Sequence, residues 1–323
     1  MRVVITGGAG FIGSNFVRLL ARERPGWELV NLDLLTYAAA PQTLRVLAAL
    51  PRYRLVQADV ADATAVSALL AEGADALVHF AAESHVDRSL VGPSAFVRTN
   101  VLGTQVLLEA ALRAGLGRYV QVSTDEVYGS LGPTCSFSED SPLRPSSPYA
   151  ASKASADLLV GAWYHSYGLP ALITRCSNNY GPYQHPEKLI PRMILRALSD
   201  RPLPIFGDGR YVRDWIHVED HCRAVLAALE HGRPGRVYNL GGGEERENLV
   251  VATAILAQLQ KPASLLSFVP DRPGHDRRYA VDASRARAEL GWAPRHHFTE
   301  GLSQTVAWYQ QHREWWAGLY PDP

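Results

Sequence analysis

Short apolar runs recur along the first half of the chain, and each is followed by a longer stretch with amphipathic spacing. The apolar runs cover residues 3–5, 28–32, 54–56, 76–80, 119–122 and 171–174, and the amphipathic stretches include 14–24, 63–71 and 93–114. Strands that alternate with helices in this way predict a parallel sheet with helices on both faces. We therefore expect an α/β fold with a doubly wound parallel sheet over residues 1–175.

The pattern loosens after residue 174. Asn, Pro and Gly are frequent over 178–183, and shorter elements follow, separated by Pro204 and by glycine-rich turns at 207–209 and 241–243. This predicts a smaller α+β lobe over residues 176–323. No clear linker separates the two parts, so some elements of the second part are expected to cross back to the first.

Composition narrows the class of protein. The 323 residues contain 32 basic and 32 acidic side chains, so no overall charge draws the chain to nucleic acid or to an anionic membrane. Cys135, Cys176 and Cys222 are far apart, and neither they nor the eleven histidines show metal-ligand spacing. With no apolar run near ~20 residues, we expect a cytoplasmic protein without disulfides or a bound metal.

A glycine-rich loop joins the first predicted strand to the first helix. It runs Thr-Gly-Gly-Ala-Gly-Phe-Ile-Gly over residues 6–13. Gly7, Gly10 and Gly13 let the backbone approach a pyrophosphate at the helix N-terminus, with Phe11 and Ile12 beside it. This context favours a Rossmann-type dinucleotide site over a glycine turn without a ligand.

An acidic residue ends the second predicted strand. Asp33 stands twenty residues past Gly13, where a carboxylate accepts hydrogen bonds from both ribose hydroxyls and repels a 2′-phosphate. The predicted cofactor is therefore NAD rather than NADP. Asp59, after the third strand, either reaches the adenine edge or caps the helix that begins near Ala61.

Tyr149 and Lys153 are spaced i, i+4 and so share one face of a predicted helix. An ammonium near the phenol, together with the positive nicotinamide ring, would lower the tyrosine pKa and let Tyr149 take a proton from an alcohol as NAD takes the hydride. The alternative is a solvated lysine beside a tyrosine at a helix start. The nucleotide-binding context favours the catalytic interpretation.

Thr124, Asp125 and Glu126 follow the fifth predicted strand, at the edge where open α/β sheets bind ligands. Thr124 would hydrogen-bond the oxygen on the oxidised carbon. Two adjacent acids in a closed site tend to separate into one acid and one base. The alternative is that Asp125 and Glu126 only cap a loop.

These motifs resemble the extended short-chain dehydrogenase/reductase family along nearly the whole chain and, within it, the dTDP-glucose 4,6-dehydratases. The resemblance is carried by the segments 6–13, 79–89, 124–126, 178–184 and 272–279 and by the Tyr149/Lys153 pair. The triplet at 124–126 is the specific part, because related epimerases and decarboxylases usually lack an Asp-Glu pair after the threonine.

The resemblance implies a lyase reaction in three steps. NAD takes hydride from C4 of the glucosyl unit while Tyr149 takes the hydroxyl proton. Glu126 then removes the C5 proton as Asp125 protonates the departing C6 hydroxyl, and NADH returns the hydride to C6. The product is dTDP-4-keto-6-deoxyglucose, and NAD ends each turnover as it began.

The resemblance also implies further binding residues. Besides those named above, cofactor contacts would come from Leu34, Thr36, Val60, Phe80, Ala81, Ala82, Thr99, Ser123 and Asn179. The sugar nucleotide would be held by Ser84, Thr124, Asn178, Lys188, Leu189, Pro204, Phe206, Arg213, Asn248, Arg272, His275 and Tyr279. Arg213 and Arg272 are the expected diphosphate partners, because guanidinium groups form paired charge-assisted bonds.

The chain departs from the family pattern in two places. Alanines at 38–40 replace the usual Ala-Gly-Asn, which affects the expected adenosine contacts, and Phe206 replaces a frequent tyrosine near the expected base. The alternatives are a sugar-nucleotide 4-epimerase or UDP-glucuronate decarboxylase on the same scaffold, and a non-catalytic NAD-binding protein. The family also implies a homodimer, formed through the apolar helices near 93–114 and 149–167.

Overall fold

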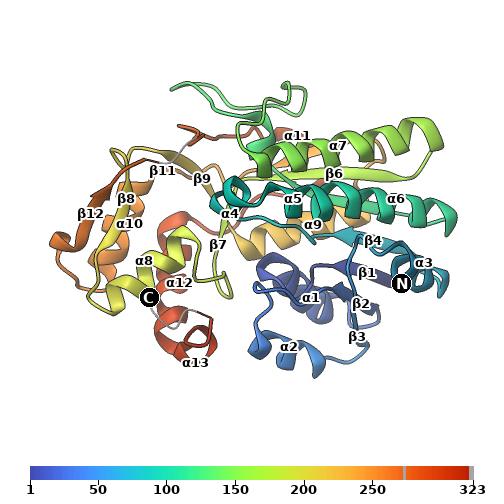
Figure 1. The fold of residues 1–323 in the computed structure, drawn as a ribbon, viewed down its shortest axis with the longest axis horizontal. Helices are drawn as coiled ribbons and strands as arrows, with labels where there is room; N and C mark the ends of the chain where they lie inside the picture. The colour runs from blue at the N-terminus through green and yellow to red at the C-terminus, as the bar shows by residue number, and fades with distance from the viewer. Residues whose placement is uncertain (272–273, 320–323) are drawn as a thin grey trace.

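A seven-stranded, wholly parallel sheet forms the centre of the protein (Figure 1). The computed structural model describes residues 1–271 and 274–319. In order across the sheet, the strands are β10 (Val237–Leu240), β6 (Ala171–Cys176), β5 (Tyr119–Thr124), β4 (Ala76–His79), β1 (Arg2–Thr6), β2 (Glu28–Asp33) and β3 (Tyr53–Gln57). The predicted doubly wound α/β fold is confirmed.

Helices cover both faces of this sheet because alternate strand residues point to opposite sides. In β1, Val3 and Ile5 join one apolar core, with α1 (Phe11–Glu23), α9 (Val218–His231) and α11 (Ser284–Leu290). Val4 joins the other, with α3 (Ala63–Ala71), α6 (Gly103–Arg113) and α7 (Pro148–Tyr167). Helix α2 (Pro41–Ala48) packs against α1 and β3.

The helix expected over residues 93–114 is not continuous. After α4 (Val86–Val91), the chain forms α5 (Pro93–Phe96), a π-helical segment η1 (Val97–Leu102) and then α6. The buried Asn100 in η1 accepts a hydrogen bond from the Glu83 amide and donates to the Glu83 carbonyl and the Ser152 hydroxyl. These bonds hold the wider turn against its neighbours, a geometry frequent at functional sites.

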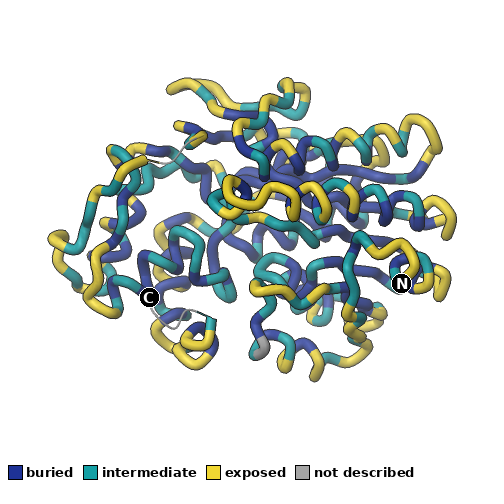
Figure 2. Tube along the Cα trace, in the orientation of Figure 1, coloured by how far each residue is buried: buried dark blue, intermediate teal, exposed yellow. Residues whose placement is uncertain are grey.

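The second part of the molecule has its own apolar core (Figure 2). Its strands are β7 (Asn178–Tyr180), β9 (Val212–His217) and β11 (Glu245–Glu247) in one sheet, and β8 (Leu203–Phe206) and β12 (Leu266–Val269) in another. Its helices are α8 (Leu189–Leu198), α10 (Asn248–Gln258), α12 (Phe298–Gln311) and α13 (Arg313–Trp316), with 3₁₀ turn η3 (Ala263–Leu265). The elements α9, β10 and α11 follow residue 175 yet pack on the central sheet. Over the described residues, no helix combines the length and apolarity needed to cross a membrane.

Candidate active site

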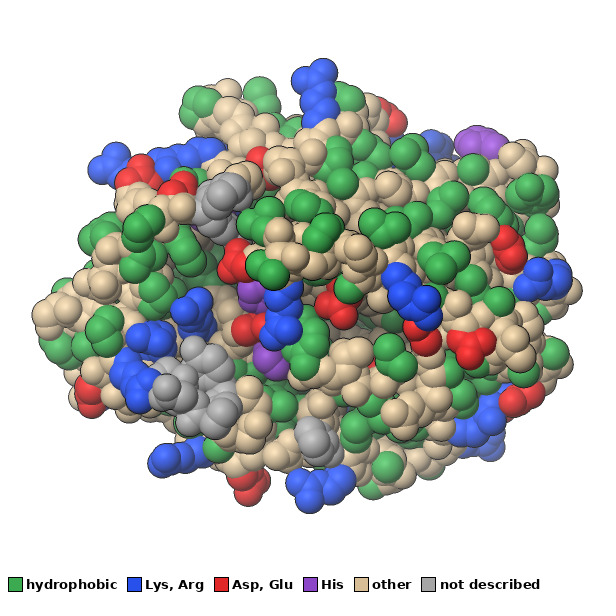
Figure 3. Space-filling model, viewed as in Figure 1, with side chains coloured by type: hydrophobic (Ala, Val, Ile, Leu, Met, Phe, Trp, Pro, Cys, Tyr) green, Lys and Arg blue, Asp and Glu red, His purple; other side chains and the backbone are tan. Residues whose placement is uncertain are grey.

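A cavity of about 320 Å³ opens at the carboxyl ends of the central strands. Every residue predicted to contact the cofactor lines it, from Gly7 in the glycine loop to Asn179 in β7. Figure 3 shows basic, acidic and histidine side chains together at the hollow between the two parts of the molecule. We call the cofactor-predicted residues that line this cavity the cofactor half of the site.

The glycine loop has the geometry that a bound pyrophosphate requires. Gly7 has a positive φ of +72°, and a Cβ on Gly13 would lie 2.2 Å from the Gly7 carbonyl oxygen. Helix α1 begins at Phe11, earlier than the sequence predicted, and Gly10 at its N-cap provides no capping side chain. The first amides of the helix are therefore available to an anion.

Asp33 lies beside this loop and is bound to it. Its two carboxylate oxygens accept hydrogen bonds from the amides of Ala9, at 2.9 Å, and Leu35, at 2.8 Å. Burial raises the pKa of Asp33 above its ordinary value, and these two bonds oppose that effect. The carboxylate thus supports the loop and still lines the cavity, where its remaining lone pairs can meet a ribose.

Asp59 also lines the cavity. It accepts from the Ala61 amide at 2.8 Å and from Arg98 at 2.9 Å. The alternative prediction, that Asp59 caps the next helix, is wrong: Asp62 is the N-cap of α3 and accepts from the amides of residues 64 and 65. The adenine contact of Asp59 stays a prediction.

Helix α7 carries Tyr149 and Lys153 into the cavity. Ser147 caps the helix by accepting from the Ala150 amide, and Pro148 occupies its first position. The Lys153 ammonium donates to the Val122 carbonyl at 2.8 Å, and the Tyr149 hydroxyl lies within hydrogen-bonding reach of Thr124.

The pKa of Tyr149 in the protein alone differs from the sequence-based expectation. Burial, and then the charge of Glu126, raise it well above its ordinary value. Burial also lowers the pKa of Lys153. A nearby positive charge, from the Lys153 ammonium or from the nicotinamide ring of a bound NAD, would favour the phenolate form of Tyr149.

Thr124, Asp125 and Glu126 lie where strand β5 passes into the 3₁₀ turn η2 (Asp125–Tyr128). The Thr124 hydroxyl accepts from the Glu126 amide and donates to Asp125, both at 3.3 Å. Asp125 is 1% exposed, and burial together with Glu126 raises its pKa well above the ordinary value. Burial therefore favours the protonated form of Asp125, the form that the acid of the pair needs.

A second group of predicted residues lies together outside this cavity, in the second part of the molecule. Arg213 (β9) places its guanidinium 4.5 Å from the centre of the Tyr279 ring. The Tyr211 ring stacks on His275 at 3.6 Å, and Phe206 meets the same histidine edge-on. We call Phe206, Arg213, Asn248, His275 and Tyr279 the nucleotide half of the site.

The two halves meet at the acid pair. Arg213 lowers and Glu126 raises the pKa of Asp125, while Glu126 contributes, after burial, to raising the pKa of Tyr279. Asn248, the first residue of α10, has a buried amide oxygen with no partner among the described residues, and its backbone amide donates to Tyr211.

The remaining predicted residues divide into three sets. Ser84, Asn178 and Lys188 line the cavity, with the Lys188 ammonium donating to the Ser84 carbonyl at 2.7 Å. Leu189 begins α8 and Pro204 lies in β8, two elements that pack together, and neither residue lines the cavity. Arg272 lies outside the described residues.

Sequence reasoning missed several groups at this site. Tyr37, Glu83, His185 and Glu187 line the cavity, yet only their places after predicted strands or near Lys188 could have indicated them. Asp214 was also missed: it is buried in β9, and its burial raises its pKa to about 6. The family departures at Ala38 and Ala39 do line the cavity, as expected for positions near adenosine.

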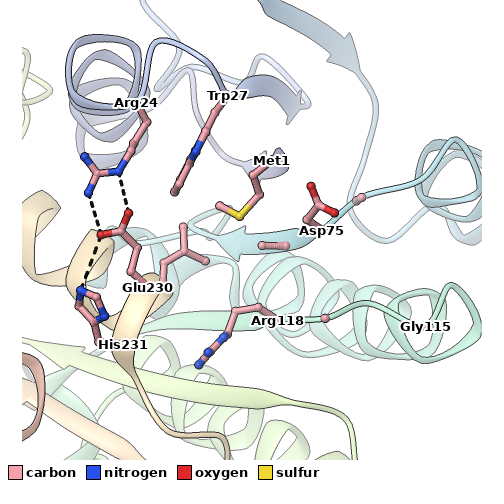
Figure 4. A pocket seen from close by; sticks show the side chains of 12 residues that line it. Met1, Arg24, Trp27, Asp75, Gly115, Arg118, Glu230 and His231 are labelled. Carbon is pink, nitrogen blue, oxygen red and sulfur yellow. Dashed lines mark hydrogen bonds and ion pairs between the residues drawn. The ribbon is translucent and has the colours of Figure 1, made fainter.

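A separate hollow of about 870 Å³ lies at the opposite, amino-terminal edge of the sheet (Figure 4). Arg24, Trp27, Arg118 and Glu230 line it, and Arg24 forms a two-bond ion pair with Glu230. None of the predicted site residues is among its lining residues.

One cluster of potential metal ligands lies elsewhere, at the start of α9. Donor atoms of His217, Glu219 and His296 lie within 4.8 Å of one another. The Nδ1 of His217 accepts from the Glu219 amide, Glu219 pairs with arginines, and His296 binds Asp220. The buried Nε2 of His217 has no hydrogen-bond partner among the described residues.

Comparisons with known proteins agree with this geometry. The family model described as GDP-mannose 4,6 dehydratase matches residues 4–305. A dTDP-glucose 4,6-dehydratase from Streptomyces niveus is 50% identical over 323 residues, covering 99% of this chain and 96% of the relative. The crystal structure of the dTDP-glucose 4,6-dehydratase DesIV from Streptomyces venezuelae, with NAD bound, has a TM-score of 0.96 and 51% identity and covers 99% of this chain and 100% of that one.

The same fold also serves a different reaction. A UDP-glucose 4-epimerase from Thermus thermophilus, in complex with NAD, has a TM-score of 0.89 and 31% identity, covering 97% of this chain and 100% of that one. Fold similarity alone therefore does not separate the two activities. The residues of the site must do so.

Proposed function

Because the chain belongs to the GDP-mannose 4,6 dehydratase family of sugar-nucleotide enzymes, we propose that it is an NAD-dependent dTDP-glucose 4,6-dehydratase. The observation that carries the proposal is the triplet Thr124, Asp125 and Glu126 beside Tyr149. A 4-epimerase needs only a redox pair at C4. A buried acid whose pKa is raised by burial, next to a second carboxylate, suits the elimination of water from C5 and C6.

In the proposed reaction, the cofactor half holds NAD, which supplies hydride transfer. Gly7 and Gly13 admit the pyrophosphate and Asp33 meets the ribose. Tyr149 takes the C4 hydroxyl proton while Lys153 holds the tyrosine in place. Asn179 is expected at the nicotinamide amide.

The nucleotide half holds the dTDP-glucose. Arg213 is the expected diphosphate partner, and the aromatic groups Phe206 and His275 are expected beside the base. Glu126 then removes the C5 proton and Asp125 protonates the leaving C6 hydroxyl, after which the hydride returns to C6. We assign cofactor binding mainly to residues 1–175 and nucleotide binding mainly to 176–323.

An assay with dTDP-, UDP- and CDP-glucose tests this proposal. The expected result is a 4-keto-6-deoxy product, formed fastest from dTDP-glucose, with no net reduction of NAD. Conversion of UDP-glucose to its C4 epimer without loss of water would instead favour the epimerase. A purified protein that retains NAD but forms no product from any of the three would favour a non-catalytic role.

We also propose that the protein is a homodimer. Leu90, Val91, Val97, Leu102 and Leu158 are between 41% and 89% exposed on α4, η1 and α7, which pack against one another. Figure 3 shows hydrophobic side chains gathered over this region, and such a patch is typical of a protein interface. For the wild type, light scattering should give twice the monomer mass. Val91→Asp combined with Leu158→Asp should give the mass of one monomer.

We further propose that the enzyme is cytoplasmic. All three cysteines are free, and two of them are buried. Unpaired thiols suit a reducing compartment.

A further inference from the structure

Asp157 lies one helical turn beyond Lys153 on α7, so Tyr149, Lys153 and Asp157 follow one another at i, i+4 and i+8 along one face. The Asp157 side chain is 1% exposed. Its Oδ2 accepts from the Arg175 guanidinium at 2.8 Å, whereas its Oδ1 is buried and has no hydrogen-bond partner among the described residues. A buried carboxylate oxygen without a donor calls for an explanation.

Arg175 accounts for only part of this arrangement. This strand β6 side chain pairs with Asp157 and also donates to the Tyr128 hydroxyl at 2.9 Å. The guanidinium therefore pairs with only one of the two carboxylate oxygens of Asp157. The carboxylate itself lies one helical turn beyond Lys153 on the same face of α7.

Lys153 needs a negative charge nearby. Its side chain is 3% exposed, and its ammonium donates a hydrogen bond to the Val122 carbonyl. Burial lowers the pKa of Lys153 and so favours loss of its proton, whereas the charge of Asp157 raises that pKa and opposes the effect of burial. A neutral lysine could not stabilise the Tyr149 phenolate.

We propose that Asp157 is a positioning residue for hydride transfer, which acts through Lys153 by keeping its side chain in the ammonium form below Tyr149. This inference rests on the proposed function, because hydride transfer is a step of that reaction. When hydride leaves C4 for NAD, the C4 hydroxyl proton moves to the Tyr149 oxygen. The Lys153 ammonium keeps its proton throughout this step, so Lys153 neither adds a proton to the reaction nor removes one.

The other titratable groups around Lys153 cannot replace Asp157. His79 on β4 is buried, and burial lowers its pKa to about 3, so it is neutral. Cys176 on β6 is a thiol whose pKa burial raises to about 12. Asp125 and Glu126 lie beside Tyr149, at the other end of this helical face, and their charges raise the pKa of Tyr149.

The lysine count of the chain makes a direct test possible. Lys153, Lys188 and Lys261 are the only three lysines, so a protein labelled with ¹³C at the lysine ε-carbon gives at most three titrating signals. In Asp157→Asn, the Lys153 signal should titrate at lower pH than in the wild type, while the signals of Lys188 and Lys261 stay in place. This readout does not depend on activity, so it separates failure of this inference from failure of the proposed function.

Two variants control for damage to the ion pair. Arg175→Gln removes the same ion pair but leaves the charge of Asp157, so the Lys153 signal should not move to lower pH. Asp157→Glu keeps the charge and should resemble the wild type. An unchanged Lys153 titration in folded Asp157→Asn would overturn the inference. A shift to lower pH in Arg175→Gln would also overturn it, and this test remains even if Asp157→Asn does not fold.

The rate should follow the titration. With dTDP-glucose, the alkaline limb of the pH–rate profile of Asp157→Asn should move to lower pH. At a pH above the alkaline limbs of both the wild type and the variant, the variant should be about tenfold or more slower than the wild type. Near neutral pH the two rates should differ by a few fold. Equal loss at every pH would indicate a structural effect only and would contradict a role through Lys153.

Discussion

The cofactor half of the site is built largely from backbone and contiguous loops, whereas the nucleotide half is built from side chains on separate elements. In the first, Gly7 and Gly13 leave the glycine loop open because they lack side chains, and Asp33 is held by two amides of neighbouring loops. In the second, Arg213 comes from β9 and Tyr279 from the chain after β12, and the two meet only in the folded protein.

This difference separates what the fold requires from what the reaction requires. The glycine loop and the Tyr149/Lys153 pair suit any NAD-dependent oxidation at C4, and the 31% identical epimerase structure has the same fold. We propose that the nucleotide half decides which sugar nucleotide is bound and that the acid pair decides what happens after oxidation. Substitutions in the two halves should therefore produce different kinetic signatures.

The largest effect is expected at the acid pair, where the two halves meet. Asp125→Asn combined with Glu126→Gln should reduce product formation by ~10²–10⁴-fold, because both proton transfers of the elimination are lost. C4 oxidation should persist, so enzyme-bound NADH should accumulate, as measured by its absorbance after mixing with dTDP-glucose. Tyr149→Phe is the control and should give neither NADH nor product. Undiminished product from the double variant would refute these roles.

A smaller effect should be confined to the nucleotide half. Arg213→Gln should raise the KM for dTDP-glucose by roughly 10–100-fold through loss of charge-assisted bonds to the diphosphate. The amount of bound NAD should not change. Arg210→Gln, at an exposed arginine three positions earlier, is the matched control and should behave as the wild type. Loss of NAD with an unchanged KM would contradict the division into two halves.

The smallest effect is expected at the cofactor ribose. Asp33→Asn should narrow the preference for NAD over NADP by about tenfold, because the carboxylate no longer repels a 2′-phosphate. The ratio of the two dissociation constants is the measurement, since any weakening of the glycine loop affects both cofactors alike. The KM for dTDP-glucose should stay the same. Equal affinity of the wild type for both cofactors would remove the assigned role of Asp33.

The sequence brought the glycine loop, Asp33 and the Tyr149/Lys153 pair to one predicted site because their signals are local, whereas most other residues of the cofactor half came from the family resemblance. The glycine spacing and Asp33 lie within one strand–helix–strand unit, and the strand pattern placed both at one sheet edge. Tyr149 and Lys153 needed only helical spacing. Such features follow from short-range geometry, which a sequence carries directly.

The features of the fold and site that local patterns did not predict depend on tertiary contacts. Arg213 donates to the Asp276 carbonyl, 63 positions away, and no periodicity encodes that meeting. The π-helical turn at Asn100 arises from its bonds to Glu83 and Ser152 rather than from residues 97–102 themselves. The raised pKa of Asp125 likewise follows from burial that only the folded chain creates. For the nucleotide half, the family resemblance rather than local pattern supplied the residues.

The central claim is that one enclosed site both removes and returns the hydride. Mass spectrometry of the product from dTDP-glucose deuterated at C4 tests it most directly. The account predicts that the deuterium is found at C6 of the 4-keto-6-deoxy sugar and that, in deuterated water, solvent label enters at C5 through Glu126. Deuterium that remains at C4, or that is lost from the product as free NADH, would contradict it.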